Sequence, residues 1–211
     1  MTEKEIRETL TEIESELSSG DSTAALLNDA GVGYYLLGEL EQSLDYLKEA
    51  VEKKDSARFL FNLANTYSGL HQPDYAVSTF LKVLEKDPGH FGALNNLADE
   101  YERKGDLDKA HELFHYLTHL QPDNPISHFN LGNFFLRQNQ HIEAAKCYEK
   151  AIEQDETFID AYHNIAWILF RSKAYSESIK YIEDGLTFDN TNDDLINLKN
   201  EIQTTQDETA G

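Results

Sequence analysis

The sequence predicts an all-α protein built from a repeated pair of helices. The main observation is a period of 34 residues that relates four similar stretches: FNLANTY at 61–67, NNLADEY at 95–101, FNLGNFF at 129–135 and HNIAWIL at 163–169. A period of this length is typical of helix–turn–helix arrays. The second observation is the spacing of apolar residues within each unit, which follows the 3.6-residue turn of a helix. We therefore expect a solenoid of antiparallel helix pairs.

The first half of each unit carries apolar or small residues at positions 4, 7, 8 and 11, counted from the start of the unit. These positions share one stripe of a helix, because they are spaced i, i+3, i+4 and i+7. The units that start at Ala57 and Phe91 show the pattern most fully. Their stripes consist of Leu60, Leu63, Ala64, Tyr67, Leu94, Leu97, Ala98 and Tyr101.

The second half of each unit predicts a second helix, with its stripe at positions 20, 24 and 27. Small residues at positions 8 and 20 let the two backbones approach closely, and aromatic residues at 11 and 24 fill the space beside them. Pro88 and Pro122 end the second helix of their units, because proline cannot continue a helix. The last two unit ends carry Glu156 and Asn190 instead.

The count of positions divides most of the chain into five repeats, the first of them poorer and one residue short. The predicted units are 24–56, 57–90, 91–124, 125–158 and 159–192.

Each end of the array needs a cover for its apolar face. Residues 1–20 predict a helix with a stripe of Ile6, Leu10, Ile13 and Leu17, which either caps the first repeat or forms a self-association seam. Residues 193–205 predict a C-terminal capping helix with Leu195, Leu198 and Ile202, and we expect 206–211 to be a disordered tail.

This pattern resembles the tetratricopeptide repeat family over residues 24–192. The resemblance implies a right-handed superhelical solenoid whose first helices line a concave face, and it implies binding of proteins or peptides there. His128 departs from the pattern, since it occupies a position at which a large apolar residue is usual.

Composition excludes several other classes of protein. The net charge of −21 argues against nucleic acid and anionic membranes as partners, because both require a basic face. The longest apolar run, IAWILF at 165–170, is too short to span a bilayer, and the charged start of the chain does not resemble a secretory leader. A single cysteine, Cys147, leaves no intramolecular disulfide. We expect an acidic cytoplasmic protein.

A polar feature recurs together with the apolar pattern. Position 6 carries asparagine in four units, and position 9 adds a second polar row in three: Asn62, Asn96, Asn130, Asn164, Asn65, Asp99 and Asn133. The resemblance places position 6 on the concave face, where some members of the family hold a peptide main chain with a ladder of asparagines. Under this interpretation Asn96 and Asn130 face solvent. The alternative is that these asparagines are a common choice in such repeats and bond neighbouring helices.

Two further sets of residues accompany the amides. Phe61, Phe129 and Trp167 would add apolar contacts, and Arg103, Arg137 and Arg171 would favour acidic side chains in a ligand. The alternative for the arginines is pairing with acids of the chain itself, which contributes about 0–1 kcal/mol at an exposed site. The predicted first helices carry five cations and five anions, so the groove would be neutral and the acidic surplus would lie elsewhere.

The sequence offers little for catalysis or metal binding. His111, His115 and His119 are spaced i, i+4 and i+8 on a predicted second helix, and imidazoles at i, i+4 can bind zinc, nickel or copper. No carboxylate or cysteine pattern completes such a site, so we expect a surface row without metal. Glycine-rich phosphate loops, nucleophile elbows and paired carboxylates in a cleft are also lacking, so neither an enzyme nor a cofactor is predicted.

The predicted function is therefore a non-enzymatic interaction module that binds an extended peptide or protein segment in its groove. The alternative is a structural scaffold that assembles with copies of itself through its terminal helices to form a homo-oligomer. Nothing in the sequence names the partner.

Overall fold

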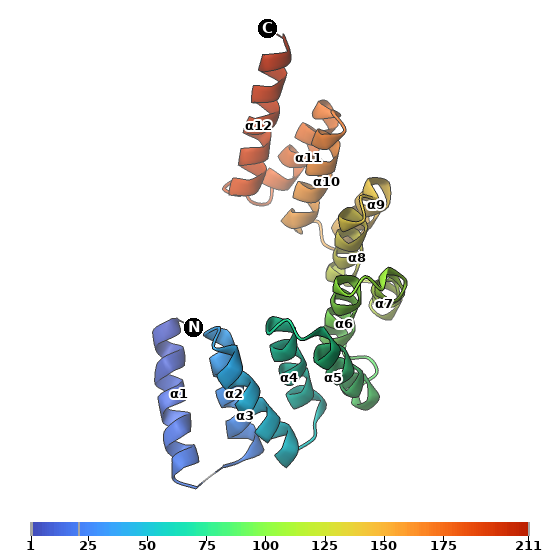
Figure 1. Cartoon of the computed structure of the whole chain (residues 1–211). Helices are drawn as coiled ribbons and strands as arrows, with labels where there is room; N and C mark the ends of the chain where they lie inside the picture. Colours follow the sequence, from blue (N-terminus) through green and yellow to red (C-terminus); the bar gives the residue numbers. More distant parts are fainter. Residues whose placement is uncertain (1, 21, 211) are drawn as a thin grey trace. The chain divides into compact units, whose positions relative to one another are not determined.

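The computed structural model describes residues 2–20 and 22–210, and α-helices are the only regular elements over these residues (Figure 1). The all-α prediction is confirmed. The helices are α1 (Glu3–Ser18), α2 (Ala24–Leu36), α3 (Leu40–Lys53), α4 (Ala57–Gly69), α5 (Pro73–Lys86), α6 (Phe91–Arg103), α7 (Leu107–Leu120), α8 (Pro125–Arg137), α9 (His141–Gln154), α10 (Ile159–Arg171), α11 (Tyr175–Leu186) and α12 (Asp193–Ala210).

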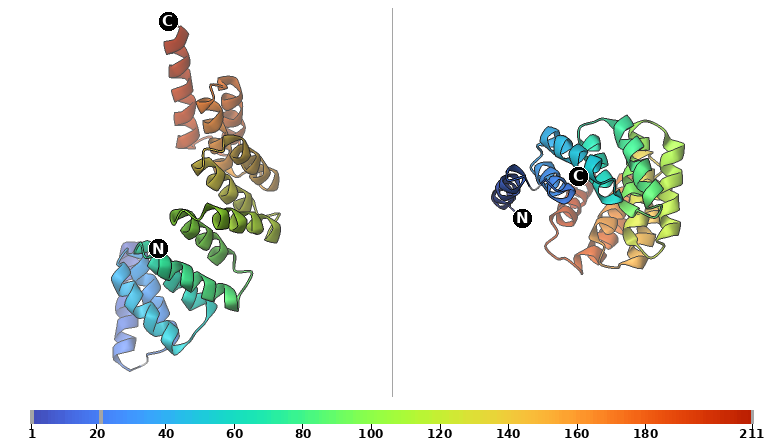
Figure 2. Two further views of the ribbon diagram at one scale, coloured as in Figure 1. Left: turned by 45° about the vertical axis from the view of Figure 1, so that its right-hand side comes forward. Right: turned by 90° about the horizontal axis from the view of Figure 1, so that it is seen from below.

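The chain divides into two compact units, and the boundary in the sequence lies inside α7 between Leu113 and Phe114. Each unit is described by itself. The first contains the pairs α2–α3 and α4–α5 together with α1 and α6, and the second contains α8–α9 and α10–α11 together with α12. The two helices of each pair run side by side in opposite directions (Figures 1 and 2). The arrangement is the repeat fold that the period predicts.

Each first helix begins at the residue where the repeat count starts a unit, and a side chain often fixes that start. The hydroxyl of Thr23 accepts the N–H of Leu26 at the start of α2, and the Ser56 hydroxyl accepts the N–H of Phe59 at the start of α4. Such caps satisfy N–H groups that lack a partner inside the helix.

The turn between the two helices of a pair has one backbone conformation in all five units. Its central residue is left-handed, with φ between 55° and 79°, at Gly38, His71, Gly105, Asn139 and Lys173. In the unit that starts at Pro125, Asn139 and Gln140 donate their N–H groups to the carbonyls of Leu136 and Phe135 at 3.0 and 2.9 Å. These bonds close the first helix and reverse the chain.

The two unit ends without proline are closed by a different device. The side chain of Asp155 accepts both the N–H and the hydroxyl of Thr157, at 2.9 and 2.7 Å. Asp189 and Thr191 repeat this turn at 3.0 and 2.7 Å. The hydroxyl bonds, followed by the backbone bonds, lower the pKa of both aspartates, because they favour the ionised form. A turn of sequence Asp-x-Thr therefore takes the place of the proline at these two unit ends.

Small residues hold the helices of a pair close together, as the spacing predicts. Ala64, Ala98 and Ala166 at position 8 are fully buried. Gly132 takes the same position in α8, where a Cβ atom would lie 2.6 Å from the ring of buried Tyr148 on α9. Position 20 is buried in every unit, at Ser43, Ala76, Ala110, Ala144 and Ser178.

The terminal helices cover the ends of the array. In α1, Ile6 and Leu10 are buried against Ala30 and Tyr34 of the first repeat, with Ile13 and Leu17 half-buried beside them. The hydroxyl groups of Tyr34 and Tyr46 both donate to Glu14 of α1, and the bond to Glu14 raises the pKa of Tyr34 to about 12. The apolar stripe of α1, which could also have served for self-association, is therefore covered by the first repeat of the same chain.

At the other end, Leu195, Leu198 and Ile202 of α12 are buried against α10 and α11. The helix continues to Ala210, so the prediction of a disordered tail at 206–211 is wrong up to that residue, and Gly211 lies outside the described residues. The stretch QDETA contains neither glycine nor proline to stop a helix. None of the helices between residues 2 and 210 combines the length and apolarity needed to cross a bilayer.

Candidate functional site

The four asparagines at position 6 lie on the first helices α4, α6, α8 and α10, and each of them is half-buried. Asn96 and Asn130, which were expected to face solvent, are thus only partly open to it. Position 6 precedes the buried position 7, so its side chain lies at the edge of the packed stripe. At this edge a neighbouring helix can cover part of the amide.

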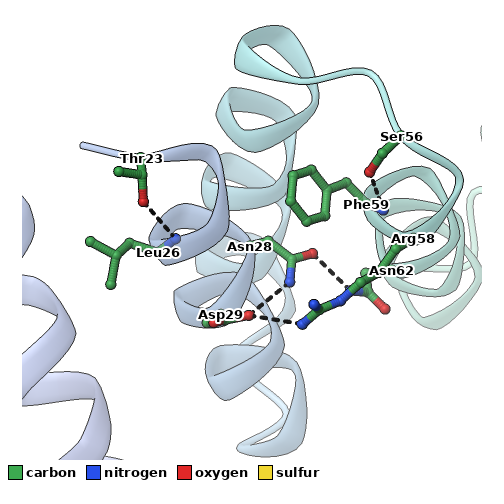
Figure 3. A network of polar contacts seen from close by, with 8 residues as sticks. All are labelled: Thr23, Leu26, Asn28, Asp29, Ser56, Arg58, Phe59 and Asn62. Carbon is green, nitrogen blue, oxygen red and sulfur yellow. Dashed lines mark hydrogen bonds and ion pairs between the residues drawn. The ribbon is translucent and has the colours of Figure 1, made fainter. Parts of the chain in front are cut away.

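In the first compact unit, which ends at Leu113, these amides link the first helices of successive repeats. Nδ2 of Asn96 on α6 donates to Oδ1 of Asn65 on α4 at 2.8 Å. Nδ2 of Asn62 on α4 donates to Oδ1 of Asn28 on α2, also at 2.8 Å (Figure 3). Bonding between neighbouring helices, which was the alternative to a ligand ladder, thus describes both contacts.

The second compact unit also has amide bonds between successive first helices. Nδ2 of Asn164 on α10 donates to Oδ1 of Asn133 on α8 at 3.4 Å, and the hydroxyl of Tyr148 donates to the same oxygen at 2.8 Å. Tyr148 is fully buried, and burial raises the pKa of its phenol, because a low-dielectric site disfavours the charged form. The phenol therefore stays protonated and acts as a donor to Asn133.

These bonds use only one half of each amide. Asn62, Asn96 and Asn164 at position 6 donate through nitrogen, whereas Asn65 and Asn133 at position 9 accept through oxygen. An amide carries both a donor and an acceptor. The carbonyl oxygen of Asn62 has no partner among residues 2–20 and 22–210. The carbonyl oxygens of Asn96 and Asn164 lie 3.3 and 3.4 Å from Nδ2 of Asn95 and Nδ1 of His163, and each can accept one further bond. Asn65 and Asn133 keep their NH2 groups for other partners.

Asp99 changes this polarity in the unit that starts at Phe91. It is half-buried at position 9 of α6, and its Oδ2 accepts a bond of 3.4 Å from Nδ2 of Asn95. The same nitrogen lies 3.3 Å from Oδ1 of Asn96. A carboxylate has no hydrogen to donate, so position 9 of this unit can only accept, whereas Asn65 and Asn133 carry an NH2 group.

A pocket of about 210 Å³ opens beside the amides of the first unit. Leu47 of α3 is buried, whereas Tyr35 and Leu36 at the end of α2 are 39% and 54% exposed. Exposed large apolar side chains beside polar groups are typical of a binding surface. The residues that line the pocket are Val32, Tyr35, Leu36, Leu47, Asn62 and Asn65.

The three predicted aromatic residues are half-buried and pack within the repeats. Phe61 lies against Phe80 and His90, with ring centroids 6.1 and 4.6 Å apart. Phe129 packs between Tyr148 and Phe158, at 5.5 and 5.0 Å, and Trp167 contacts the apolar clusters of the second unit. Each of the three therefore presents only part of its ring to solvent.

The three arginines end the first helices α6, α8 and α10, and all are exposed. Arg103 pairs with the buried carboxylate of Glu100 and donates to the hydroxyl of Ser68 at 2.7 Å. The guanidinium of Arg171 lies 5.6 Å from the centre of the Trp167 ring. Pairing with an acid of the chain, the alternative to ligand contact, describes Arg103.

The histidine row lies on α7. The rings of His115 and His119 are 4.5 Å apart, and Nδ1 of His119 lies 2.9 Å from the carbonyl oxygen of His115. Within residues 2–20 and 22–210, no group of three or more His, Cys, Asp or Glu side chains is gathered as a metal ion requires. Cys147 is half-buried, and burial raises the pKa of its thiol to about 11, which disfavours the reactive thiolate.

His128, which departs from the apolar pattern, is half-buried on α8. Its Nε2 lies 2.9 Å from the carbonyl oxygen of Pro122, in the turn before its own helix. A polar side chain at this position thus has a polar partner.

Four residues of the first repeat belong to the site but were not predicted from the sequence: Asn28, Asp29, Tyr35 and Leu36. Asn28 stands 34 residues before Asn62, so the period alone could have found it. Because the first repeat is one residue short, a count from its start at Ala24 places Asp29 at position 6 in place of Asn28.

Comparison with known families agrees with the observed fold. Two profiles described as tetratricopeptide repeat match residues 23–54 and 61–110. A profile described as the cilia and flagella-associated protein 70 middle TPR-like domain matches residues 94–194.

The known proteins that resemble this chain have low sequence identity to it. Human protein O-mannosyl-transferase TMTC3 is 24% identical over 182 residues, which are 79% of this chain and 20% of that protein. The chain thus spans about a fifth of that relative. The pilF protein of Pseudomonas aeruginosa superposes with a TM-score of 0.70 at 19% identity, over 89% of this chain and 86% of that one. MamA from Desulfovibrio magneticus RS-1 gives 0.66 at 19%, over 81% and 97%. At these identities the superpositions show the fold.

Proposed function

Because the chain belongs to the tetratricopeptide repeat family, whose domains are generally protein–protein interaction modules, we propose that it binds an extended peptide along its first helices. The groups that face the ligand are the carbonyl oxygens of Asn62, Asn96 and Asn164 and the NH2 groups of Asn65 and Asn133. A peptide main chain presents N–H donors and C=O acceptors at regular intervals. A periodic face with both kinds of group can therefore bind it with little regard to its side chains.

The observation that carries this proposal is the common polarity of the amide bonds. Asn62, Asn96 and Asn164 all donate to the preceding first helix through nitrogen. The inter-helix bonds therefore orient the amides and do not exhaust them. An oriented amide loses less conformational freedom on binding than a free one, which favours affinity.

We propose a binding role without catalysis, cofactor or metal for this chain. The match covers only 20% of the O-mannosyl-transferase, and the transferase name applies to that protein. The partner remains defined by its chemistry, as a segment in extended conformation.

The test changes Asn96 and Asn130 together to Ala. Linear peptides are first selected from a random library on the wild-type protein, and their affinities for both proteins are then measured by calorimetry. We expect a loss of about 1–3 kcal/mol, since main-chain groups of the bound peptide lose their partners. Asn197→Ala, an exposed asparagine of α12, is the matched control and should bind as the wild type does.

Circular dichroism of the double variant separates lost binding from lost folding, because Asn96 also bonds Asn65. A folded double variant that binds as tightly as the wild type would contradict the proposal. Failure to select any peptide would favour a scaffold that assembles without using this face.

A further inference from the structure

A polar network in the first unit fixes which end of the Asn62 amide is available (Figure 3). Oδ1 of Asp29 accepts Nδ2 of Asn28 at 3.0 Å and the guanidinium of Arg58 at 3.2 Å. Because a carboxylate can only accept, the nitrogen of Asn28 must face Asp29. The oxygen of Asn28 then faces Asn62, and Asn62 must present its nitrogen to Asn28.

This chain of bonds leaves Oδ1 of Asn62 without a partner among residues 2–20 and 22–210. Asn65 is fixed in the opposite sense, since its Oδ1 accepts Nδ2 of Asn96 at 2.8 Å. Its NH2 group has no bonding partner within the described chain. One acceptor and one donor therefore stand on the wall of the same pocket.

The rest of the pocket is apolar. Leu47 forms a buried part of the lining, and Val32, Tyr35 and Leu36 of α2 surround it. The volume of about 210 Å³ exceeds the cavity of about 150 Å³ that holds benzene in an engineered protein. A single large apolar side chain is therefore of the right size.

We propose that this pocket holds one large apolar side chain of the bound peptide, while Asn62 and Asn65 bond the main chain beside it. This inference rests on the proposed function and gives it a fixed register. Asp29 acts as a positioning residue, because it orients Asn62 through Asn28 without lining the pocket.

Charge excludes an ionised occupant. The nearest charged groups of the network, Asp29 and Arg58, form an ion pair with each other at 3.2 Å, so they leave little net charge beside the pocket. An ionised side chain would lose its hydration among Val32, Leu36 and Leu47 and find no opposite charge there. A neutral apolar anchor has no such cost.

The test is a double-mutant cycle between the anchor and Leu36. Leu36 is 54% exposed at the end of α2, so Leu36→Ala should leave the fold intact. Peptides selected on the wild type should share a Leu, Ile, Phe, Tyr or Trp, and changing it to Ala should weaken binding about tenfold or more, which is about 1.4 kcal/mol. In Leu36→Ala the same peptide change should cost much less, because the two side chains contact each other.

The control is Leu81→Ala, an exposed leucine of α5 in the same unit that does not line the pocket. It should leave the effect of the anchor change undiminished. If Leu36→Ala behaves like this control while Asn96/Asn130→Ala abolishes binding, the pocket assignment is overturned and the proposed function stands. If the wild type selects no peptide, both fall together, and light scattering of the protein alone shows whether a second copy occupies this face.

Discussion

At the scale of single residues, the left-handed turn shows how backbone conformation selects side chains. His71, Asn139 and Lys173 hold φ values of 55°, 58° and 64°, although a left-handed backbone costs most residues roughly 1–2 kcal/mol. Gly38 and Gly105 occupy the same turn in other units without this cost. The turn geometry is therefore imposed by helix pairing, and the residue at its centre adapts to it.

Replacing Lys173 by Gly should raise the free energy of unfolding by about 0.5–1 kcal/mol, because glycine adopts the left-handed conformation without strain. Urea unfolding followed by circular dichroism measures the change. The matched control is Lys180→Gly, an exposed site inside α11, which should lower stability by about 1 kcal/mol. Destabilisation by both changes would show that the Lys173 turn is not strained.

At the scale of helices, each pair depends on close backbone approach. Gly132 of α8 faces the ring of Tyr148, whose hydroxyl is also needed as a donor to Asn133. The contact joins packing to the candidate site, because the same tyrosine fills the space between two helices and bonds an amide of the polar row. A change in this contact should therefore affect stability first and the orientation of Asn133 second.

Gly132→Ala should destabilise the protein by about 1–3 kcal/mol, since the new methyl group would lie 2.6 Å from the Tyr148 ring in a packed interior. Thermal unfolding measures this loss. Gly89→Ala serves as the control, because its methyl group would meet nothing closer than 3.9 Å. Equal stability of Gly132→Ala and the wild type would mean that the pair is packed more loosely than described.

Helix positions followed from the sequence because they depend on local periodicity. The spacing of Leu60, Leu63 and Ala64 is enough to define a buried stripe. The partners of the amides were not predictable in this way, because the bond from Asn96 to Asn65 depends on the register between two helices. The Asp155 turn was missed for another reason: a side-chain bond replaced the proline that usually marks a unit end.

At the scale of the whole chain, the terminal helices determine whether the repeat array is stable as a monomer. Deletion of residues 1–18 would remove Ile6 and Leu10, whose burial contributes about 1.5–3 kcal/mol each, and would expose Ala30 and Tyr34 of the first repeat. We expect lower stability in urea and an unchanged oligomeric state by light scattering. Conversion of a dimer into an equally stable monomer would instead identify α1 as a self-association helix.

The central claim is that the first helices recognise the main chain of an extended peptide. The most direct measurement is an N-methyl scan, in which each N–H of one selected peptide is replaced in turn and its affinity measured. We predict losses of about 1–3 kcal/mol at several main-chain positions, because an N-methyl group cannot donate to the carbonyl oxygens of the position 6 asparagines. Changing side chains other than the pocket anchor should have much smaller effects. A peptide whose affinity survives methylation at every position, and depends on its side chains alone, would contradict the claim.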